Sequence, residues 1–135
     1  MEIMKQFLVD ADIVINHLKG RSRRGFGLGD LLNQGLLHIS SVTVAEIWSG
    51  LPAEQKRKVE KILDQMERLG VPVELGKLAG SLVYSHARRG IRVTTIDAIV
   101  AAMSQANRLI LVSHDKVFAK IKGLKLYSPA GILNE

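Results

Sequence analysis

Cysteine is absent from the 135-residue sequence, and its absence excludes several kinds of chemistry at once. Thiol catalysis, disulfide bonds and cysteine-ligated zinc all require this residue type. A cytoplasmic location, where disulfide bonds are rare, fits such a chain and is the one we expect. Aromatic residues make up only 4% of the sequence. Because bulky rings are scarce, we expect a core built from aliphatic side chains.

Long apolar runs are missing as well. No stretch approaches the roughly 18–20 apolar residues of a membrane-spanning helix, and the start of the chain lacks the pattern of a secretory signal, so we expect no membrane association. Acidic residues are few, with 13 Asp and Glu against 19 Lys and Arg and a net charge of +6. A basic balance favours a polyanionic partner such as nucleic acid, although it serves solubility equally well.

The residues that are present alternate between strand and helix patterns. The chain is 47% hydrophobic, and we expect residues 1–135 to form one domain with one core. Strands are expected at residues 3–9, 37–41, 71–74, 109–112 and 125–127. Helices are expected at residues 12–18, 28–36, 43–69, 78–89 and 95–107, with another short helix at Asp115. The alternation predicts an α/β fold, with a mostly parallel sheet covered by helices on both faces.

Four acids fall at corresponding places in this pattern. Asp10 directly follows the first expected strand, and Glu46 lies in the first turn after the second. Asp97 lies in the first turn of a buried helix, and Asp115 follows the fourth expected strand. Right-handed crossovers bring helix N-termini and strand C-termini to one edge of a parallel sheet, where ligands bind. We therefore expect the four carboxylates to converge.

Each acid also has a purely structural interpretation. Glu46 can complete a capping box with Thr43, Asp97 can complement the dipole of a helix capped by Thr95, and Asp115 can cap a helix. Asp12 suits an N-cap of the first helix or an acid that orients the others. Asp10 is the hardest to explain in this way, because a carboxylate that ends an apolar strand gains nothing from a cap. The structural interpretations leave unexplained why all four reach one edge.

Converging carboxylates repel one another, and a divalent cation removes that cost. Oxygen ligands without cysteine or clustered histidine point to Mg²⁺ or Mn²⁺, which activate water for phosphodiester hydrolysis. His114 neighbours the site and is a candidate for phosphate contact. The basic segment at residues 19–25 is either a solvated connection or a phosphate contact. The RNA-binding candidates are Arg21, Arg23, Arg24 and Arg92. The glycine-rich run at residues 25–29 fails as a phosphate-binding loop and is expected to be a turn.

The segments that carry the four acids are Leu8–Ile15, Ser41–Ile47, Thr95–Ala102 and Leu111–Phe118. In this order they resemble the PIN-domain family, and more narrowly the VapC-type toxins of toxin–antitoxin pairs. The resemblance implies an α/β/α sandwich, an Mg²⁺- or Mn²⁺-dependent endoribonuclease, a small antitoxin partner and a homodimer. It places the metal-site acids at Asp10, Glu46, Asp97 and Asp115, with Ser113 as the hydroxyl before the fourth. Ala11 replaces the family's usual hydroxyl residue, and the extra acid Asp12 either joins the site or tightens metal binding.

Two other classes remain as alternatives. A non-toxin or non-catalytic PIN domain, acting in RNA processing or RNA binding, would share the same fold. A phosphoacceptor receiver domain also has an acidic pocket on a parallel sheet, but it needs a lysine directly after a late strand. None follows residues 109–112 in that way. The hypothesis we carry forward is a metal-dependent ribonuclease.

Overall fold

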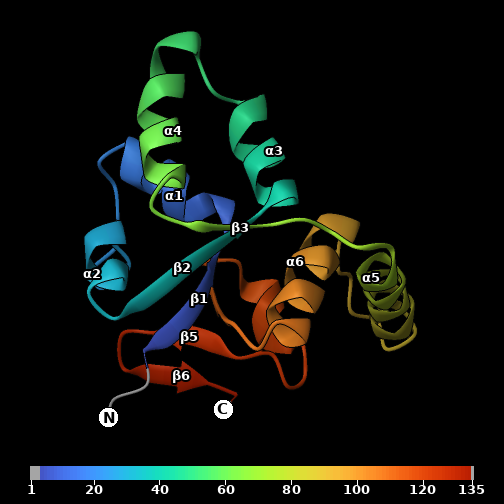
Figure 1. Cartoon of the computed structure of the whole chain (residues 1–135). Helices are drawn as coiled ribbons and strands as arrows, with labels where there is room; N and C mark the ends of the chain where they lie inside the picture. Colours follow the sequence, from blue (N-terminus) through green and yellow to red (C-terminus); the bar gives the residue numbers. More distant parts are fainter. Residues whose placement is uncertain (1–3, 135) are drawn as a thin grey trace.

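A six-stranded sheet runs through the middle of the molecule, in the order β3-β2-β1-β4-β5-β6 (Figure 1). This computed structural model describes residues 4–134. The strands are β1 (Lys5–Val9), β2 (Gly35–Ser40), β3 (Glu67–Leu69), β4 (Ile110–Val112), β5 (Leu126–Ser128) and β6 (Gly131–Leu133). The first five are parallel, and β6 pairs with β5 in the antiparallel direction. The expected mostly parallel α/β fold is confirmed.

Helices cover both faces of the sheet. The longer ones are α1 (Ala11–Leu18), α2 (Leu28–Leu32), α3 (Ser41–Ser49), α4 (Lys56–Leu63), α5 (Val73–Ala87) and α6 (Thr95–Ala106). Two short 3₁₀ helices are η1 (Ala53–Gln55) and η2 (Lys116–Lys120). The helices α1 to α4 gather on one side, and α5 and α6 on the other (Figure 1). Among residues 4–134, no helix is both long enough and apolar enough to cross a bilayer.

Alternation along β1 divides the core between the two faces. Phe7 and Val9 pack with α1 to α4, whereas Leu8 packs with α5, α6 and η2. Successive side chains of a strand point to opposite faces, so a continuous apolar strand fills both layers. Phe7, Leu8 and Val9 are completely buried, which fixes β1 at the centre of the sandwich. The residue that follows them is thereby held at the sheet's carboxyl edge.

The prediction of one helix across residues 43–69 is wrong. The segment contains α3, η1, α4 and then β3, which pairs with β2 from His38 to Ser40. Pro52 lies between α3 and η1, and its backbone nitrogen has no hydrogen to continue a helix. The apolar spacing before Leu69 resembles a helix, but pairing with a distant strand overrides this local pattern.

The predicted strand at residues 71–74 is also wrong. Pro72 is the N-cap of α5, which begins at Val73 and not at the predicted Leu78. Proline suits a helix start because the first helical turn has amides without helical partners. Three other predictions need smaller corrections. Helix α2 ends at Leu32 and β2 begins at Gly35, so the predicted helix 28–36 is too long and the predicted strand 37–41 begins too late. The residues after the predicted strand 125–127, for which no element was predicted, contain β6.

Candidate active site

Asp10 links the end of β1 to the start of α1. Its Oδ1 accepts a hydrogen bond from the Ala11 amide at 2.9 Å, and its Oδ2 accepts one from the Ser113 hydroxyl at 2.8 Å. Asp10 is the N-cap of α1 and is only 9% exposed. The expectation that Asp12 caps this helix is therefore wrong, as is the expectation that Asp10 has no capping role. One carboxylate both starts the helix and faces the neighbouring strand.

Ser113 connects three of the acidic positions. It follows β4, which pairs with β1 through Val9 and Val112. The Ser113 hydroxyl donates to Asp10, lies 3.5 Å from Asp12 Oδ2 and accepts a hydrogen bond from the Asp115 amide at 3.1 Å. A single hydroxyl thus ties the end of β1 to the turn after β4.

Asp12 lies in the first turn of α1 and faces the turn after β4. Its Oδ2 accepts the His114 backbone amide at 2.7 Å, which orients the carboxylate. Its Oδ1 is buried and has no hydrogen-bond partner among residues 4–134. A buried carboxylate oxygen without a partner is costly, and a cation or a donor would relieve that cost.

The other acids come from two helices and a turn. Glu46 lies on α3, which is capped by Ser40 through a 3.1 Å bond from the Thr43 amide, so the predicted Thr43–Glu46 capping box is wrong. Asp97 lies in the first turn of α6, whose cap is Thr94 rather than the predicted Thr95. Because Ser40 caps α3, Glu46 is not needed as a capping partner, whereas Asp97 keeps its place in the first turn of α6, where it can complement the helix dipole.

Asp115 retains a structural role. Its Oδ1 accepts the Val117 amide at 3.0 Å and caps η2. The side chain is otherwise exposed, and its backbone is bound to Ser113. Capping uses one oxygen and leaves the second oxygen available at the carboxyl edge.

Electrostatic coupling shows that these acids lie near one another. Burial raises the pKa of Asp10 to about 6, and the charges of Asp12 and Glu46 also raise it, against hydrogen bonds from Ser113 and Ala11. Burial raises the pKa of Glu46, with further contributions from Asp97 and Asp12. Burial likewise raises the pKa of Asp97, and Asp115 and Asp12 add to this effect. Like charges near each other favour protonation, so the carboxylates form one interacting group.

This donor set fits a hard divalent cation. It consists of carboxylate and hydroxyl oxygens, and it contains a buried acid with a raised pKa and an unpartnered carboxylate oxygen. In the part of the chain that the structure describes, no three acid or histidine side chains are already arranged to hold one ion. The residues that would hold it are Asp10, Glu46, Asp97 and Asp115, with Asp12 beside them.

The basic candidates lie on two other segments of the chain. Arg21, Arg23 and Arg24 are exposed in the loop after α1. Arg92 lines a groove of about 510 Å³ with Thr94 and Thr95, at the start of α6. Burial lowers the pKa of His114, whose ring packs on Phe26 with centroids 4.4 Å apart. His114 thus donates its backbone amide to Asp12 and packs its ring against Phe26.

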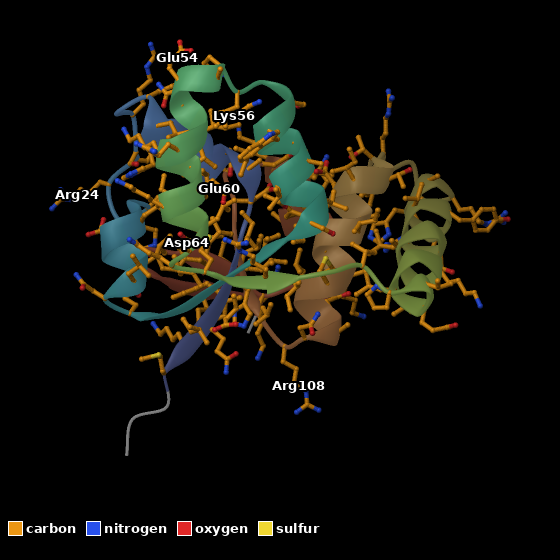
Figure 2. All side chains as sticks on the ribbon, turned by 45° about the horizontal axis from the view of Figure 1, so that its top comes forward. Arg24, Glu54, Lys56, Glu60, Asp64 and Arg108 are labelled. Atoms are coloured by element: carbon orange, nitrogen blue, oxygen red, sulfur yellow. The ribbon has the colours of Figure 1, made fainter. Side chains whose placement is uncertain are left out.

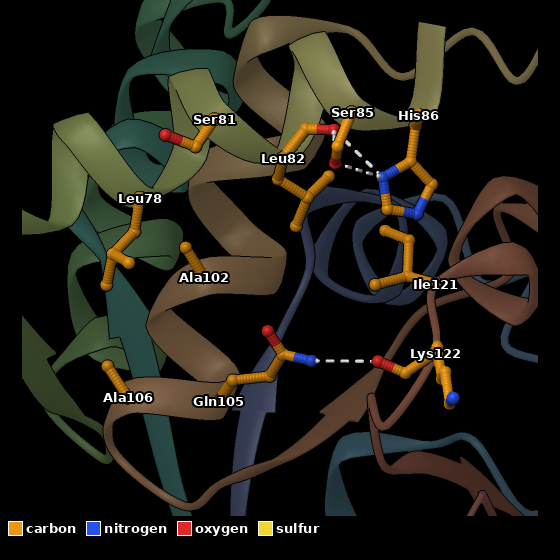
Figure 3. A pocket seen from close by; sticks show the side chains of 10 residues that line it. All are labelled: Leu78, Ser81, Leu82, Ser85, His86, Ala102, Gln105, Ala106, Ile121 and Lys122. Carbon is orange, nitrogen blue, oxygen red and sulfur yellow. Dashed lines mark hydrogen bonds between the residues drawn. The ribbon is translucent and has the colours of Figure 1, made fainter. Parts of the chain in front are cut away.

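A larger hollow lies away from the acids. Figure 3 shows a groove of about 560 Å³ between α5, α6 and Ile121–Lys122. Its hydrogen bonds include the 2.8 Å bond from His86 Nδ1 to the Leu82 carbonyl and the 3.3 Å bond from Gln105 to the Lys122 carbonyl. None of the acids described above lines this groove, so size alone does not locate the candidate site.

A third groove, which the sequence did not reveal, begins at Glu46. Its volume is about 380 Å³, and it is lined by Ile15 and Leu18 from α1 and by Ile47 and Leu51 from α3 and the residues after it. Gln55 also lines it, and its buried Oε1 has no hydrogen-bond partner among residues 4–134. No local motif marks these residues, because the groove forms only when η1 folds back toward α1.

The fold and site together define an α/β protein with an acidic site at the carboxyl edge of its sheet. Residues 7–124 match the PIN domain, and the chain belongs to the PIN-domain family. This confirms the resemblance drawn from the four acidic segments. The match spans β1, β2, β3 and β4, and so includes every acid described above.

Within the PIN-domain family, the chain is similar to VapC ribonucleases. Ribonuclease VapC10 from Mycobacterium tuberculosis is 27% identical over 119 residues, which are 85% of this chain and 90% of the relative. The tRNA(fMet)-specific endonuclease VapC from Shigella flexneri is 27% identical over 131 residues, which are 90% of this chain and 96% of the relative. The chain is thus homologous to VapC ribonucleases.

Solved structures show the same fold. The DNA-bound VapBC structure from Salmonella typhimurium aligns with a TM-score of 0.77 at 22% identity, covering 94% of this chain and 99% of that one. VapBC2 from Rickettsia felis, bound to a promoter DNA fragment, aligns with a TM-score of 0.76 at 20% identity, covering 90% and 97%. These similarities confirm the three-layer α/β/α architecture expected from the resemblance.

Proposed function

We propose that residues 1–135 form a single Mg²⁺- or Mn²⁺-dependent endoribonuclease domain, the toxin of a type II toxin–antitoxin pair. The observation that carries the proposal is the coupling of Asp10, Glu46, Asp97 and Asp12 at one edge of the sheet, with the pKa of Asp10 raised to about 6. The homology to VapC ribonucleases supports RNA as the substrate. Cellular RNA would place its action in the cytoplasm.

Each residue has a distinct part in the proposed reaction. Asp10, Asp97 and Asp115 would hold the metal, directly or through water, and Glu46 would bind it or orient the attacking water. A bound Mg²⁺ or Mn²⁺ supplies a Lewis acid and lowers the pKa of a bound water, so no histidine base is needed. Ser113 positions Asp10 by donating to Oδ2, and the His114 amide positions Asp12.

The chain's own hydrogen bonds keep Asp10 oriented before any ion binds. Ala11 and Ser113 each donate to a different oxygen of Asp10, so rotation of the carboxylate would break both bonds. Such fixed partners around a metal-binding carboxylate raise affinity, and loss of one typically costs about 10–100-fold. Asp12 stands beside the metal-holding acids in this proposal, with its Oδ2 held by the His114 amide.

The groove that begins at Glu46 supports an antitoxin partner. Several solved structures with this fold are VapBC or toxin–antitoxin complexes. Ile15, Leu18 and Leu51 offer an apolar surface, and the lining also includes the negative charge of Glu46 and the positive charge of Lys19. An antitoxin segment with an apolar face and a basic side chain at one end would match both features.

A homodimer stays a prediction. Val73, Leu78 and Tyr84 on α5 are its candidate contacts, since all three are large and exposed.

Cleavage of total RNA by the purified chain tests the proposal. We expect Mg²⁺-dependent cleavage that EDTA abolishes, and loss of more than about a hundredfold in Asp10→Asn, because a direct ligand should matter more than the residues that support it. Circular dichroism checks that the variant is folded. Equal cleavage by Asp10→Asn and wild type would refute the proposal. RNA binding without cleavage would favour the non-catalytic PIN domain.

A further inference from the structure

We infer that Arg21, Arg23 and Arg24 form a preset binding place for RNA phosphates, held beside the acidic site by the docking of Gly25 and Phe26 onto the C-terminal strands. We call residues 21–24 the arginine segment. The inference rests on the proposed function, since it names how the same site would take hold of its substrate. The loop was expected to be either a solvated connection or a phosphate contact, and its anchoring favours the second.

Gly25 fixes the end of the arginine segment. Its φ is +82°, and its carbonyl accepts a 2.6 Å hydrogen bond from the Tyr127 hydroxyl. A Cβ at this position would lie 2.7 and 2.9 Å from the ring carbons of Pro129. The backbone therefore approaches Pro129 more closely than any other residue type would allow.

Phe26 anchors the same loop through aromatic contacts. Its ring lies 4.4 Å from that of His114 and 5.2 Å from that of Tyr127 between centroids. Tyr127 in turn packs edge-on against Phe7 at 5.6 Å and is 7% exposed. These rings form a continuous cluster from the centre of the sheet to the loop, and such edge-to-face pairs stabilise a defined geometry.

His114 connects the loop to the acids. Its ring contacts Phe26, while its backbone amide donates to Asp12 Oδ2 at 2.7 Å. One ring contact and one hydrogen bond from a backbone amide thus link Phe26, two residues after the arginine segment, to Asp12. The Phe26 amide also donates to the Arg23 carbonyl at 2.9 Å, which ties the arginine segment to the docked ring.

The arginines remain available at this fixed place. Across residues 4–134 the ion pairs are Arg68–Asp64 and Lys77–Glu74, and neither involves the arginine segment. Arg24 projects away from the body of the molecule (Figure 2). Guanidinium groups pair with phosphate through two parallel hydrogen bonds, and an anchored loop loses less entropy on binding than a free one.

The test compares two glycine variants in full-length protein. Gly25→Ala combines a strained backbone with a clash against Pro129. Gly20→Ala, at φ +65°, has comparable strain and nothing within 4 Å of the new Cβ. Binding of a fluorescein-labelled single-stranded RNA is measured by anisotropy in an Asp10→Asn background, at salt concentrations from about 50 to 200 mM. Cleavage by the same variants, with Asp10 intact, gives kcat and KM.

We expect Gly25→Ala to flatten the dependence of log K on log salt concentration by about two, since each single-strand phosphate contact contributes about 0.7. Its KM should rise about tenfold and its kcat should change little, because lost phosphate contacts weaken binding rather than chemistry. Gly20→Ala should match the parent. Equal effects of the two variants, or no effect of Gly25→Ala, would overturn the inference.

A charge-only variant covers the case in which Gly25→Ala does not fold. Replacing Arg21, Arg23 and Arg24 by Gln leaves the docking contacts intact and should give the same loss of salt dependence. The matched control replaces Arg57, Lys58 and Lys61 on α4, which are exposed. An equal loss in the control would overturn the inference, because any basic surface would then serve. Failure of the wild type to cleave RNA with Mg²⁺ would instead count against the proposed function, since the binding comparison does not use cleavage.

Discussion

The amino edge and the carboxyl edge of the parallel sheet differ in packing and in charge. At the amino edge, β1 and β2 approach so closely that a Cβ on Gly35 would overlap the Lys5 carbonyl group. At the carboxyl edge, Asp10 is buried with its pKa raised to about 6, and Asp12 has an oxygen without a hydrogen-bond partner among residues 4–134. The amino edge is shaped for close packing, whereas the carboxyl edge gathers charges at a cost in stability. A cation bound by these acids would offset that cost in stability.

The largest effect on stability is expected from Asp10→Asn. A raised pKa in the folded state means that neutral Asp10 is favoured there. Its contribution to stability is therefore present below about pH 4 and is lost as the pH rises through about 6, a difference of about 3 kcal/mol. Without divalent ions, Asp10→Asn should be more stable than wild type near pH 7 by up to that amount. Urea unfolding in EDTA measures both the gain and its disappearance at low pH.

Two outcomes would weaken the contrast between the edges. The first is that Asp10→Asn proves no more stable than wild type near pH 7, and the second is that its advantage persists unchanged near pH 4. Either result would mean that the charged Asp10 carboxylate does not strain the fold. Adding Mg²⁺ should reverse the order, because the ion stabilises only the protein that binds it.

Gly35→Ala should damage the opposite edge. Overlap with the Lys5 carbonyl forces β1 and β2 apart, and we expect a loss of about 1–3 kcal/mol in the free energy of unfolding. Gly29→Ala in α2 is the matched control, because nothing lies within 4 Å of its added Cβ. Urea unfolding of both variants measures the difference. Equal stability of the two variants would show that the amino edge is not closely packed.

Ser113→Ala should lower cleavage more than it lowers stability. The variant removes the hydroxyl that donates to Asp10 and accepts from the Asp115 amide, and we expect about 10–100-fold slower cleavage. Ser113→Thr keeps the hydroxyl and should restore much of the rate. The rate of Mg²⁺-dependent cleavage is the measurement, with Tm as the stability check. A wild-type rate in Ser113→Ala would remove Ser113 from the site.

The smallest effect is expected for an acid outside the carboxyl edge. Asp64 is exposed at the end of α4 and pairs with Arg68 at 2.9 Å (Figure 2). Such surface pairs contribute less than about 1 kcal/mol, so Asp64→Asn should change stability little and cleavage not at all. Urea unfolding and the cleavage assay together test this. A loss of cleavage here would show that removing any acid harms the protein, whatever its location.

The sequence predicted the centre of the molecule better than its borders. The strands β1 and β4 and the helix α6 were found because each is a local apolar run with clear ends. The short strand β3 was missed because it exists only through pairing with β2, and Glu67–Leu69 has no strand pattern of its own. Helix caps were misplaced by one to three residues, since Ser, Thr and Asp occur next to one another at each start.

For the candidate site, the sequence predicted the acids but not the hydrogen bonds that hold them. The acids could be chosen because each directly follows a recognisable strand or opens a recognisable helix. Their hydrogen bonds could not be predicted, because the contact of Ser113 with Asp10 joins residues 103 positions apart in the chain. The contact of Gly25 with Pro129 could not be predicted either, since no sequence motif links the two residues. Local pattern thus identified the acids, and only tertiary structure showed what holds them and the arginine segment in place.

Anomalous diffraction from crystals grown with Mn²⁺ tests the metal site most directly. We predict a manganese peak at the carboxyl edge of the sheet, about 2 Å from an oxygen of Asp10 and bound to at least one of Asp97, Asp115 and Glu46. The peak should be absent in Asp10→Asn and unchanged in Asp64→Asn. A manganese peak bound elsewhere, or one at this edge that persists in Asp10→Asn, would contradict the account.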